Sequence, residues 1–145
     1  MRIAIGSDHG GFDYKLAVIK HLIEKEYEVK DFGTYDKNSC NYPEYAKKVC
    51  DVVVSGEYER GILICGTGIG MSIAANKVKG IRAALCSDTF SARATREHND
   101  SNVLCMGQRV IGEGLALDIV DVWLSSVFQG GRHEVRVNMI TDMEK

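Results

Sequence analysis

One cysteine stands directly before a glycine-rich loop. Residues 62–70 read ILICGTGIG, so a hydrophobic run ends at Cys65 and three glycines follow within five positions. Glycines let a backbone approach a ligand closely, and the N–H groups at the start of a helix stabilise negative charge. Such donors also favour a thiolate over a thiol. A base beside this loop suits proton abstraction next to a carbonyl, where an enediolate must be held.

The same loop has competing interpretations. A dinucleotide fingerprint, G-x-G-x-x-G, fails because its sixth position is Met71 when counted from Gly66 and Ile73 when counted from Gly68. A phosphate-binding P-loop is absent from the chain. A tight turn with no chemistry stays open, since glycine commonly serves that purpose. The hydroxyl of Thr67 would add a group able to relay a proton between two oxygens.

Short β-rich runs alternate with helical patterns along the chain. This alternation predicts an α/β, three-layer Rossmann-like fold, with a five-stranded parallel sheet flanked by helices. We expect Pro43 in the first turn of one helix, Ser87 as the N-cap of another, and Leu16, Ile19, Leu22 and Ile23 on one apolar helix face. The predicted strands cover 2–6, 29–32, 61–65, 81–86 and 103–106, and the predicted helices cover 12–26, 42–55, 70–77, 88–98, 112–126 and 132–143.

This topology locates the chemistry, because ligands of open parallel sheets bind outside the carboxyl ends of the strands. The predicted sheet brings Asp8, His9, Cys65 and Arg109 to that edge. The loop 34–41 is polar and is predicted to be a surface connection only.

Other polar residues have two interpretations each. His98 ends a predicted helix, where the dipole alone would favour it, or it serves a site. Arg132 and Arg136 share a helix face, which indicates either a solvated surface or a phosphate clamp. His21 and His133 are predicted to be surface residues, and no His, Cys or Asp cluster has metal-ligand spacing.

Composition bounds the class of protein. The chain has 145 residues, 45% hydrophobic and 26% charged, which fits a single globular domain over 1–145. A net charge of −2 gives no reason to expect nucleic acid or an anionic membrane surface. The five cysteines form no C-x-x-C pair, and no apolar run suggests a signal peptide or a spanning helix. We therefore expect a soluble, cytoplasmic protein.

Four motifs together resemble a known family. They are SDHGG at 7–11, ICGTGIGMSIAANK at 64–77, HND at 98–100 and GGRHEVRV at 130–137. The chain resembles type B ribose-5-phosphate isomerase from end to end; the wider family includes the galactose-6-phosphate isomerase subunits. The resemblance implies a cofactor-independent, metal-free aldose–ketose isomerase that interconverts ribose 5-phosphate and ribulose 5-phosphate in the non-oxidative branch of the pentose phosphate pathway.

The resemblance also implies residue roles. Cys65 would move a proton between C1 and C2, and Asp8 and His98, assisted by Asn99, would bind the sugar hydroxyls and open the ring. Arg132 and Arg136 would bind the phosphate, with His9 and Arg109 as further contacts. The enediolate would be held by Gly66, Thr67, Gly68, Ile69 and Gly70. Some relatives use a glutamate further along this loop, where this chain has Asn76-Lys77, so the thiol type is the better match.

In this family the site is shared across a homodimer, with His98, Asn99 and the C-terminal arginines coming from the partner subunit. The last helix, after Gly130-Gly131, would extend onto that partner, and dimer and tetramer both stay open. The main alternative is an isomerase of a six-carbon phosphosugar, allose 6-phosphate or galactose 6-phosphate. A sugar-phosphate-binding module without catalysis is a further alternative, but recognition alone has no need of a base. The galactose enzyme divides its catalytic parts between two different subunits, whereas all the matching residues occur on this one chain.

Overall fold

A five-stranded parallel sheet forms the centre of the molecule. The computed structural model describes all residues, 1–145. The strands lie in the order β2-β1-β3-β5-β4 and every neighbouring pair is parallel, which confirms the predicted sheet. Their bounds are β1 (Arg2–Ser7), β2 (Glu28–Asp31), β3 (Arg60–Cys65), β4 (Ala83–Leu85) and β5 (Val103–Gly107).

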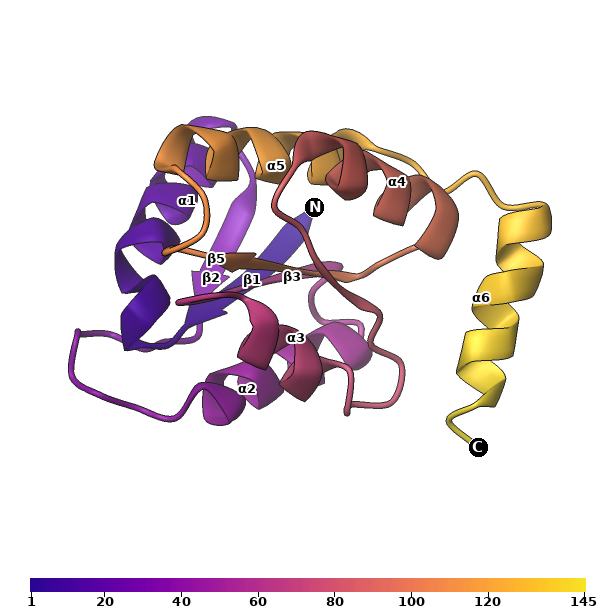
Figure 1. Cartoon of the computed structure of the whole chain (residues 1–145), viewed down its shortest axis with the longest axis horizontal. Coiled ribbons are helices and arrows are strands. Elements are labelled where there is room, and N and C mark those ends of the chain that lie inside the picture. Colours follow the sequence, from indigo (N-terminus) through magenta and orange to yellow (C-terminus); the bar gives the residue numbers. More distant parts are fainter.

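Helices cover both faces of the sheet, so the predicted three layers are present (Figure 1). One face carries α1 (Phe12–Glu24), α4 (Thr89–Asn99) and α5 (Glu113–Ser125), and the other carries α2 (Tyr42–Val54) and α3 (Ile69–Ala75). A short 3-10 turn, η1 (His9–Gly11), precedes α1. The last helix, α6 (Arg132–Asp142), stands at one end of the molecule beside α4.

The hydrophobic pattern of the central strands explains this layering. All five residues of β5, and all residues of β3 after Arg60, are buried, as expected for strands covered on both faces. Alternate side chains serve two cores: Ile62 and Ile64 pack under α1 and α5, while Leu63 and Cys65 pack under α2 and α3.

Two local predictions were wrong. In α1, Leu22 is buried and Ile19 packs against the core as predicted, but Leu16 and Ile23 are exposed, and Lys15 and Val18 complete the buried stripe. Lys15 can be fully buried because its ammonium group finds partners, as described below. The N-cap of α4 is Asp88 and not Ser87, because the Asp88 carboxylate accepts a hydrogen bond from the backbone N of Ser91 at 2.8 Å.

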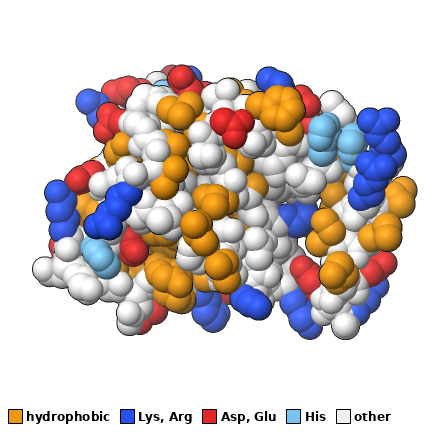
Figure 2. All heavy atoms as spheres, viewed as in Figure 1, with side chains coloured by type: hydrophobic (Ala, Val, Ile, Leu, Met, Phe, Trp, Pro, Cys, Tyr) orange, Lys and Arg blue, Asp and Glu red, His pale blue; other side chains and the backbone are white.

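The helix α6 leaves much apolar surface uncovered. Val135, Met139 and Met143 are 62%, 63% and 83% exposed, and their spacing of four places them on one side of the helix. In Figure 2 hydrophobic side chains stand out at the α6 end of the molecule. None of the helices is long and apolar enough to cross a membrane.

Candidate active site

The loops after β1, β3 and β5 meet at one end of the sheet, beside the carboxyl ends of the strands. The chain leaves β1 toward β2 on one side and later returns to β3 on the other, so the strand order reverses between β1 and β3. Such a switch point opens a crevice at the carboxyl ends of the strands. Asp8 directly follows β1, Cys65 ends β3 and Arg109 follows β5, so the predicted edge residues do come together.

Asp8 is held rigidly at this edge. Its Oδ1 accepts hydrogen bonds from the backbone N of Gly10 at 2.9 Å and of Gly11 at 3.1 Å, which makes it the N-cap of η1. The turn lies against the glycine-rich loop, because a Cβ added to Gly10 would lie 3.2 Å from the backbone N of Gly66. Asp8 and the loop after Cys65 are therefore neighbours.

The Cys65 thiol faces a backbone donor. The N–H of Gly68 donates to the Cys65 Sγ at 3.1 Å, and the cysteine is 4% exposed. Gly68 has a φ of +78°, a left-handed conformation that glycine adopts without strain. Gly107 on β5 lets this loop pack tightly, since a Cβ there would lie 2.5 Å from the carbonyl carbon of Thr67. The loop is thus shaped around the sulfur.

The rest of the loop is fixed by the segment after β5. The backbone N of Gln108 donates to the Cys65 carbonyl at 3.0 Å, and that of Arg109 donates to the Gly66 carbonyl at 2.9 Å. The side chain of Arg109 runs alongside Gly66, with its Cδ 3.6 Å from where a Cβ of Gly66 would lie. Thr67 is exposed, and its Oγ1 accepts a hydrogen bond from the N of Ile69 at 3.2 Å.

The other buried cysteines have no comparable environment. Burial, with a smaller contribution from Asp51, raises the pKa of Cys50 to about 12. Burial likewise raises the pKa of Cys86 to about 11 and that of Cys105 well above its usual value. These thiols stay protonated at neutral pH, so they behave as small hydrophobic residues.

Sequence reasoning missed two residues beside this edge. The loop 34–41 is more than a surface connection, because the backbone N of Cys40 donates to His9 Nδ1 at 3.2 Å. A neutral His9 therefore carries its proton on Nε2, where it is a donor toward solvent or a ligand. The ring of Tyr42 lies against Gly70, since a Cβ there would be 2.7 Å from Tyr42 Cζ. A long loop returning to a switch point was the only available signal.

An ion pair made by the buried Lys15 supports the same carboxyl end of the sheet. The ammonium group of Lys15, fully buried, lies 2.7 Å from Asp31 Oδ1 and also donates to the carbonyl of Thr34. Thr34 N in turn donates to the Ser7 carbonyl at 2.7 Å, directly before Asp8. The loop after β2 is thus tied to the end of β1. Nothing in the sequence marked Lys15 for this position except its place in the buried stripe of α1.

The remaining predicted site residues lie at the opposite end of the sheet, beside the amino ends of the strands. His98 and Asn99 end α4, and the turn after them reaches the amino end of β3, where the N of Gly61 donates to the Asn102 carbonyl at 2.9 Å. With a rise of about 3.3 Å per residue, the two ends of the six-residue β3 lie roughly 16 Å apart. His98 therefore cannot reach the Cys65 of its own chain.

The two C-terminal arginines belong to this second group. The rings of His98 and His133 stack with centroids 4.4 Å apart, and His133 lies on α6 between Arg132 and Arg136 in sequence. Figure 2 shows His side chains beside a cluster of Lys and Arg at the α6 end of the molecule.

His133 is buried in this stack, so the prediction that it is a surface residue was wrong. His21 is half-buried, with its Nε2 2.8 Å from Asp121 Oδ1.

His133 should make the contact between α4 and α6 sensitive to acid. Its burial, followed by His98, Arg132 and Arg136, lowers its pKa below the usual 6.5. The unfolded chain then binds a proton more readily than the native one, so stability falls as the pH drops below about 6.5. We expect His133→Gln to reduce this loss between pH 7 and pH 5, measured as urea midpoints. An unchanged pH dependence would contradict a neutral, stacked His133.

No three His, Cys, Asp or Glu side chains gather in an arrangement that could hold a metal ion.

A parallel sheet with a thiol and a glycine loop at its switch point defines an α/β protein of the Rossmann-like class. The chain belongs to the Ribose/Galactose Isomerase family, which matches residues 3–140. It is 51% identical to ribose-5-phosphate isomerase B of Escherichia coli over 144 residues, covering 99% of this chain and 97% of the relative.

Solved structures show the same likeness. A ribose-5-phosphate isomerase B from Clostridium thermocellum is 56% identical and superimposes with a TM-score of 0.99, covering 99% of this chain and 97% of that one. The enzyme from Mycoplasma genitalium, solved with bound ribulose-5-phosphate, is 41% identical with a TM-score of 0.94, covering 99% and 95%. The α/β fold is therefore shared along the whole chain.

Proposed function

We propose that this chain is a cofactor-independent aldose–ketose isomerase that interconverts ribose 5-phosphate and ribulose 5-phosphate. The observation that carries the proposal is the Cys65 sulfur, which accepts a backbone N–H at 3.1 Å inside a glycine loop at the switch point. Membership of the Ribose/Galactose Isomerase family supports the reaction class. The residues 1–145 act together as a single domain in this proposal.

Cys65 is the base. As a thiolate it takes the proton from C2 of the open-chain aldose and returns it to C1, so that a ketose forms through an enediolate. Backbone N–H groups of the loop hold the charge that develops on the oxygens. Thr67, exposed beside the sulfur, passes a proton between O1 and O2. The loop residues in this role are Gly66, Thr67, Gly68, Ile69 and Gly70.

Ring opening and phosphate binding fall to the remaining polar groups. Asp8 and His98, with Asn99, bind the sugar hydroxyls and open the furanose ring. Arg132 and Arg136 bind the phosphate, since paired guanidinium groups form strong, charge-assisted contacts with it. His9, through its Nε2–H, and Arg109 make further contacts with the substrate.

The active unit in this proposal is a homodimer with shared sites. Within one chain the two halves of the site lie at opposite ends of the strands, so a second chain must complete each half. The α6 stripe of Val135, Met139 and Met143 is apolar surface that such a partner would cover.

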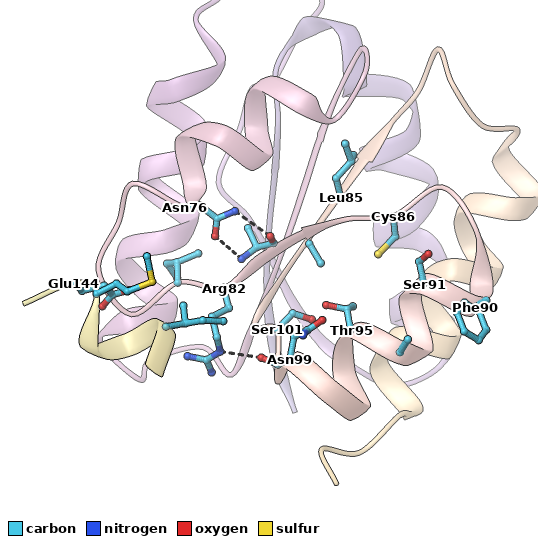
Figure 3. A pocket seen from close by; sticks show the side chains of 16 residues that line it. Asn76, Arg82, Leu85, Cys86, Phe90, Ser91, Thr95, Asn99, Ser101 and Glu144 are labelled. Atoms are coloured by element: carbon cyan, nitrogen blue, oxygen red, sulfur yellow. Dashed lines mark hydrogen bonds between the residues drawn. The ribbon is translucent and has the colours of Figure 1, made fainter. Parts of the chain in front are cut away.

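A groove of about 700 Å³ beside β4 is the surface that fits the partner (Figure 3). One end reaches the glycine loop, because a Cβ on Gly68 would lie 2.6 Å from Leu85 Cδ1, and the other end holds Asn99. A two-fold axis through the groove would bring the Asn99 end of one chain to the Leu85 end of the other, an isologous contact. On the free edge of β4, the side-chain amide of Asn76 hydrogen-bonds to both the N and the carbonyl of Ala83. The backbone of Leu85 on the same edge would then be the part of β4 available to a partner chain.

We also propose a cytoplasmic location. A thiol that acts as a base must stay reduced, and cytoplasmic compartments keep thiols reduced.

Substrate length is the open choice within the family, whose name covers both ribose and galactose isomerases. Turnover of ribose 5-phosphate, allose 6-phosphate and galactose 6-phosphate by the purified protein decides it. We expect the highest kcat/KM with ribose 5-phosphate. A higher value with a six-carbon substrate would favour the alternative, and binding without turnover of any of them would favour a binding module.

Replacement of Arg136 should weaken phosphosugar binding. A charge-assisted contact with phosphate contributes roughly 1.5–3 kcal/mol, so we expect Arg136→Ala to raise the Kd for ribose 5-phosphate about 10- to 150-fold. Lys145→Ala removes a cation from the same end of the chain and should leave the Kd unchanged. Calorimetric titration of both variants checks this, and an unaltered Kd in Arg136→Ala would remove α6 from the phosphate site.

A further inference from the structure

Two arginines grip the turn that follows α4. The Nε of Arg82 donates to the carbonyls of Asn99 at 3.2 Å and Asp100 at 3.0 Å. The Nη1 of Arg96 donates to the Ser101 carbonyl at 2.5 Å and to Asp100 Oδ1 at 2.9 Å. Figure 3 shows Arg82, the residue just before β4, reaching across to Asn99. The carbonyls at the end of the helix, which lack helical partners, are thus satisfied by side chains.

Asp100 is the residue that joins the two arginines. It adopts a left-handed conformation, φ 48° and ψ 45°, and its Oδ2 lies 3.4 Å from Arg82 Nη2. A third guanidinium group, that of Arg60, is close enough that Arg96 lowers its pKa and Asp100 raises it, after the larger lowering by burial. The Arg96 side chain is only 5% exposed, so its charge depends on the Asp100 carboxylate as a partner.

The contacts of Arg82 and Arg96 fix the backbone after α4 but leave the side chains of His98 and Asn99 free. The backbone N of Asn102 donates to the Arg82 carbonyl at 3.0 Å, and Trp123 Nε1 donates to Ser101 Oγ at 3.0 Å, so the turn is held from several sides. Asn99 has no side-chain hydrogen bond within the chain, and the His98 ring has only its stack on His133. A rigid backbone that presents uncommitted polar side chains is the arrangement a functional group needs.

We propose that Asp100, Arg82 and Arg96 are positioning residues. They hold His98 and Asn99 in the orientation in which these side chains reach the Cys65 site of the other subunit. The proposal rests on the shared site described under Proposed function. Misplacement of a reacting group by about 1 Å can cost on the order of a hundredfold in rate. A loosened turn therefore lowers turnover even though Asp100, Arg82 and Arg96 do not contact the substrate.

The test is Asp100→Asn, which removes the charge while Asn tolerates the left-handed conformation. In the homodimer we expect kcat to fall about ten- to a hundredfold, as positioning effects do. Heterodimers isolated through two different affinity tags then separate positioning from general damage. In the trans form one chain carries Asp100→Asn and the other carries Cys65→Ala. In the cis form one chain carries both changes and its partner is wild type.

The cis and trans heterodimers contain the same substitutions and differ only in their arrangement. If each site were confined to one chain, the trans form would have one site with an intact Cys65 and an altered His98 turn, and one site with an intact turn and no base. The cis form would then have one fully intact site, in its wild-type chain, and one site that carries both changes. Sites confined to single chains would therefore make the cis form the more active one.

Shared sites reverse this order. In trans, the intact Cys65 of one chain then meets the intact His98 turn of the other, so we expect about half the wild-type activity. In cis, the only site with Cys65 meets the altered turn, so we expect about half the activity of the Asp100→Asn homodimer. Equal activities would overturn the positioning role, because the change would then act on the whole fold. Higher activity in cis would instead overturn the shared site itself.

Arg82→Met provides a second variant if Asp100→Asn does not fold. It keeps most of the aliphatic stem and removes the donors to Asn99 and Asp100, while Asp100 stays in place as the partner of the more deeply buried Arg96. The same cis and trans comparison applies, with the same expected order of activities and the same contradicting results.

Discussion

Cys65→Ala should abolish isomerisation while substrate binding stays nearly intact. A base acts in the transition state and contributes little to ground-state affinity, so kcat should fall on the order of a hundredfold or more. The alanine also leaves the loop backbone in place, because the substitution removes only the hydrogen bond that Gly68 N donates to the sulfur. Steady-state turnover and calorimetric titration with ribose 5-phosphate measure the two effects separately.

Cys50→Ala is the matched control for this variant. Cys50 is a buried thiol in the same core as Cys65, and burial keeps it protonated by raising its pKa to about 12. We expect it to retain wild-type turnover with a modest loss of stability. Near-normal turnover in Cys65→Ala, or an equal loss in both variants, would remove Cys65 from the chemistry.

The layout of strands and helices could be predicted because it depends on local patterns. The runs that became β3 and β5 are apolar at nearly every position, which indicates strands covered on both faces. Pro43 lies in the first turn of α2, where its missing N–H costs nothing. The edge residues Asp8, Cys65 and Arg109 followed from the same pattern, since the ends of parallel strands must lie on one side of the sheet.

Side-chain partners distant in sequence could not be predicted in the same way. Lys15 is buried and Leu16 is exposed because Asp31 and the carbonyl of Thr34 offer the ammonium group a site, a tertiary contact that outweighs hydrophobicity. His133 is buried because α6 folds back against the end of α4 and stacks it on His98. Neither partner is visible from the periodicity of the helix that carries the residue.

The division of the candidate site into two halves was implied by the family resemblance, but its geometry needed the structure. From the residues alone, His98 was either a helix end favoured by the dipole or a site residue, and only the resemblance assigned it to a site shared with a partner. The contact of Asn102 with Gly61 places the end of α4 at the amino end of β3, whereas Cys65 lies at its carboxyl end. In the proposed site, one chain therefore carries two groups of residues at opposite ends of β3.

The most direct test of a shared site mixes two inactive proteins. His98→Ala lacks the ring-opening group in every site and Cys65→Ala lacks the base, so each homodimer should be inactive. Under conditions that exchange subunits, half of the dimers become heterodimers, and in each of these one site regains both wild-type residues. Activity should then recover to about a quarter of the wild-type value, given random exchange and two-fold pairing. If mass spectrometry verifies the exchange and no activity returns, His98 and Cys65 act within one chain and the shared site is wrong.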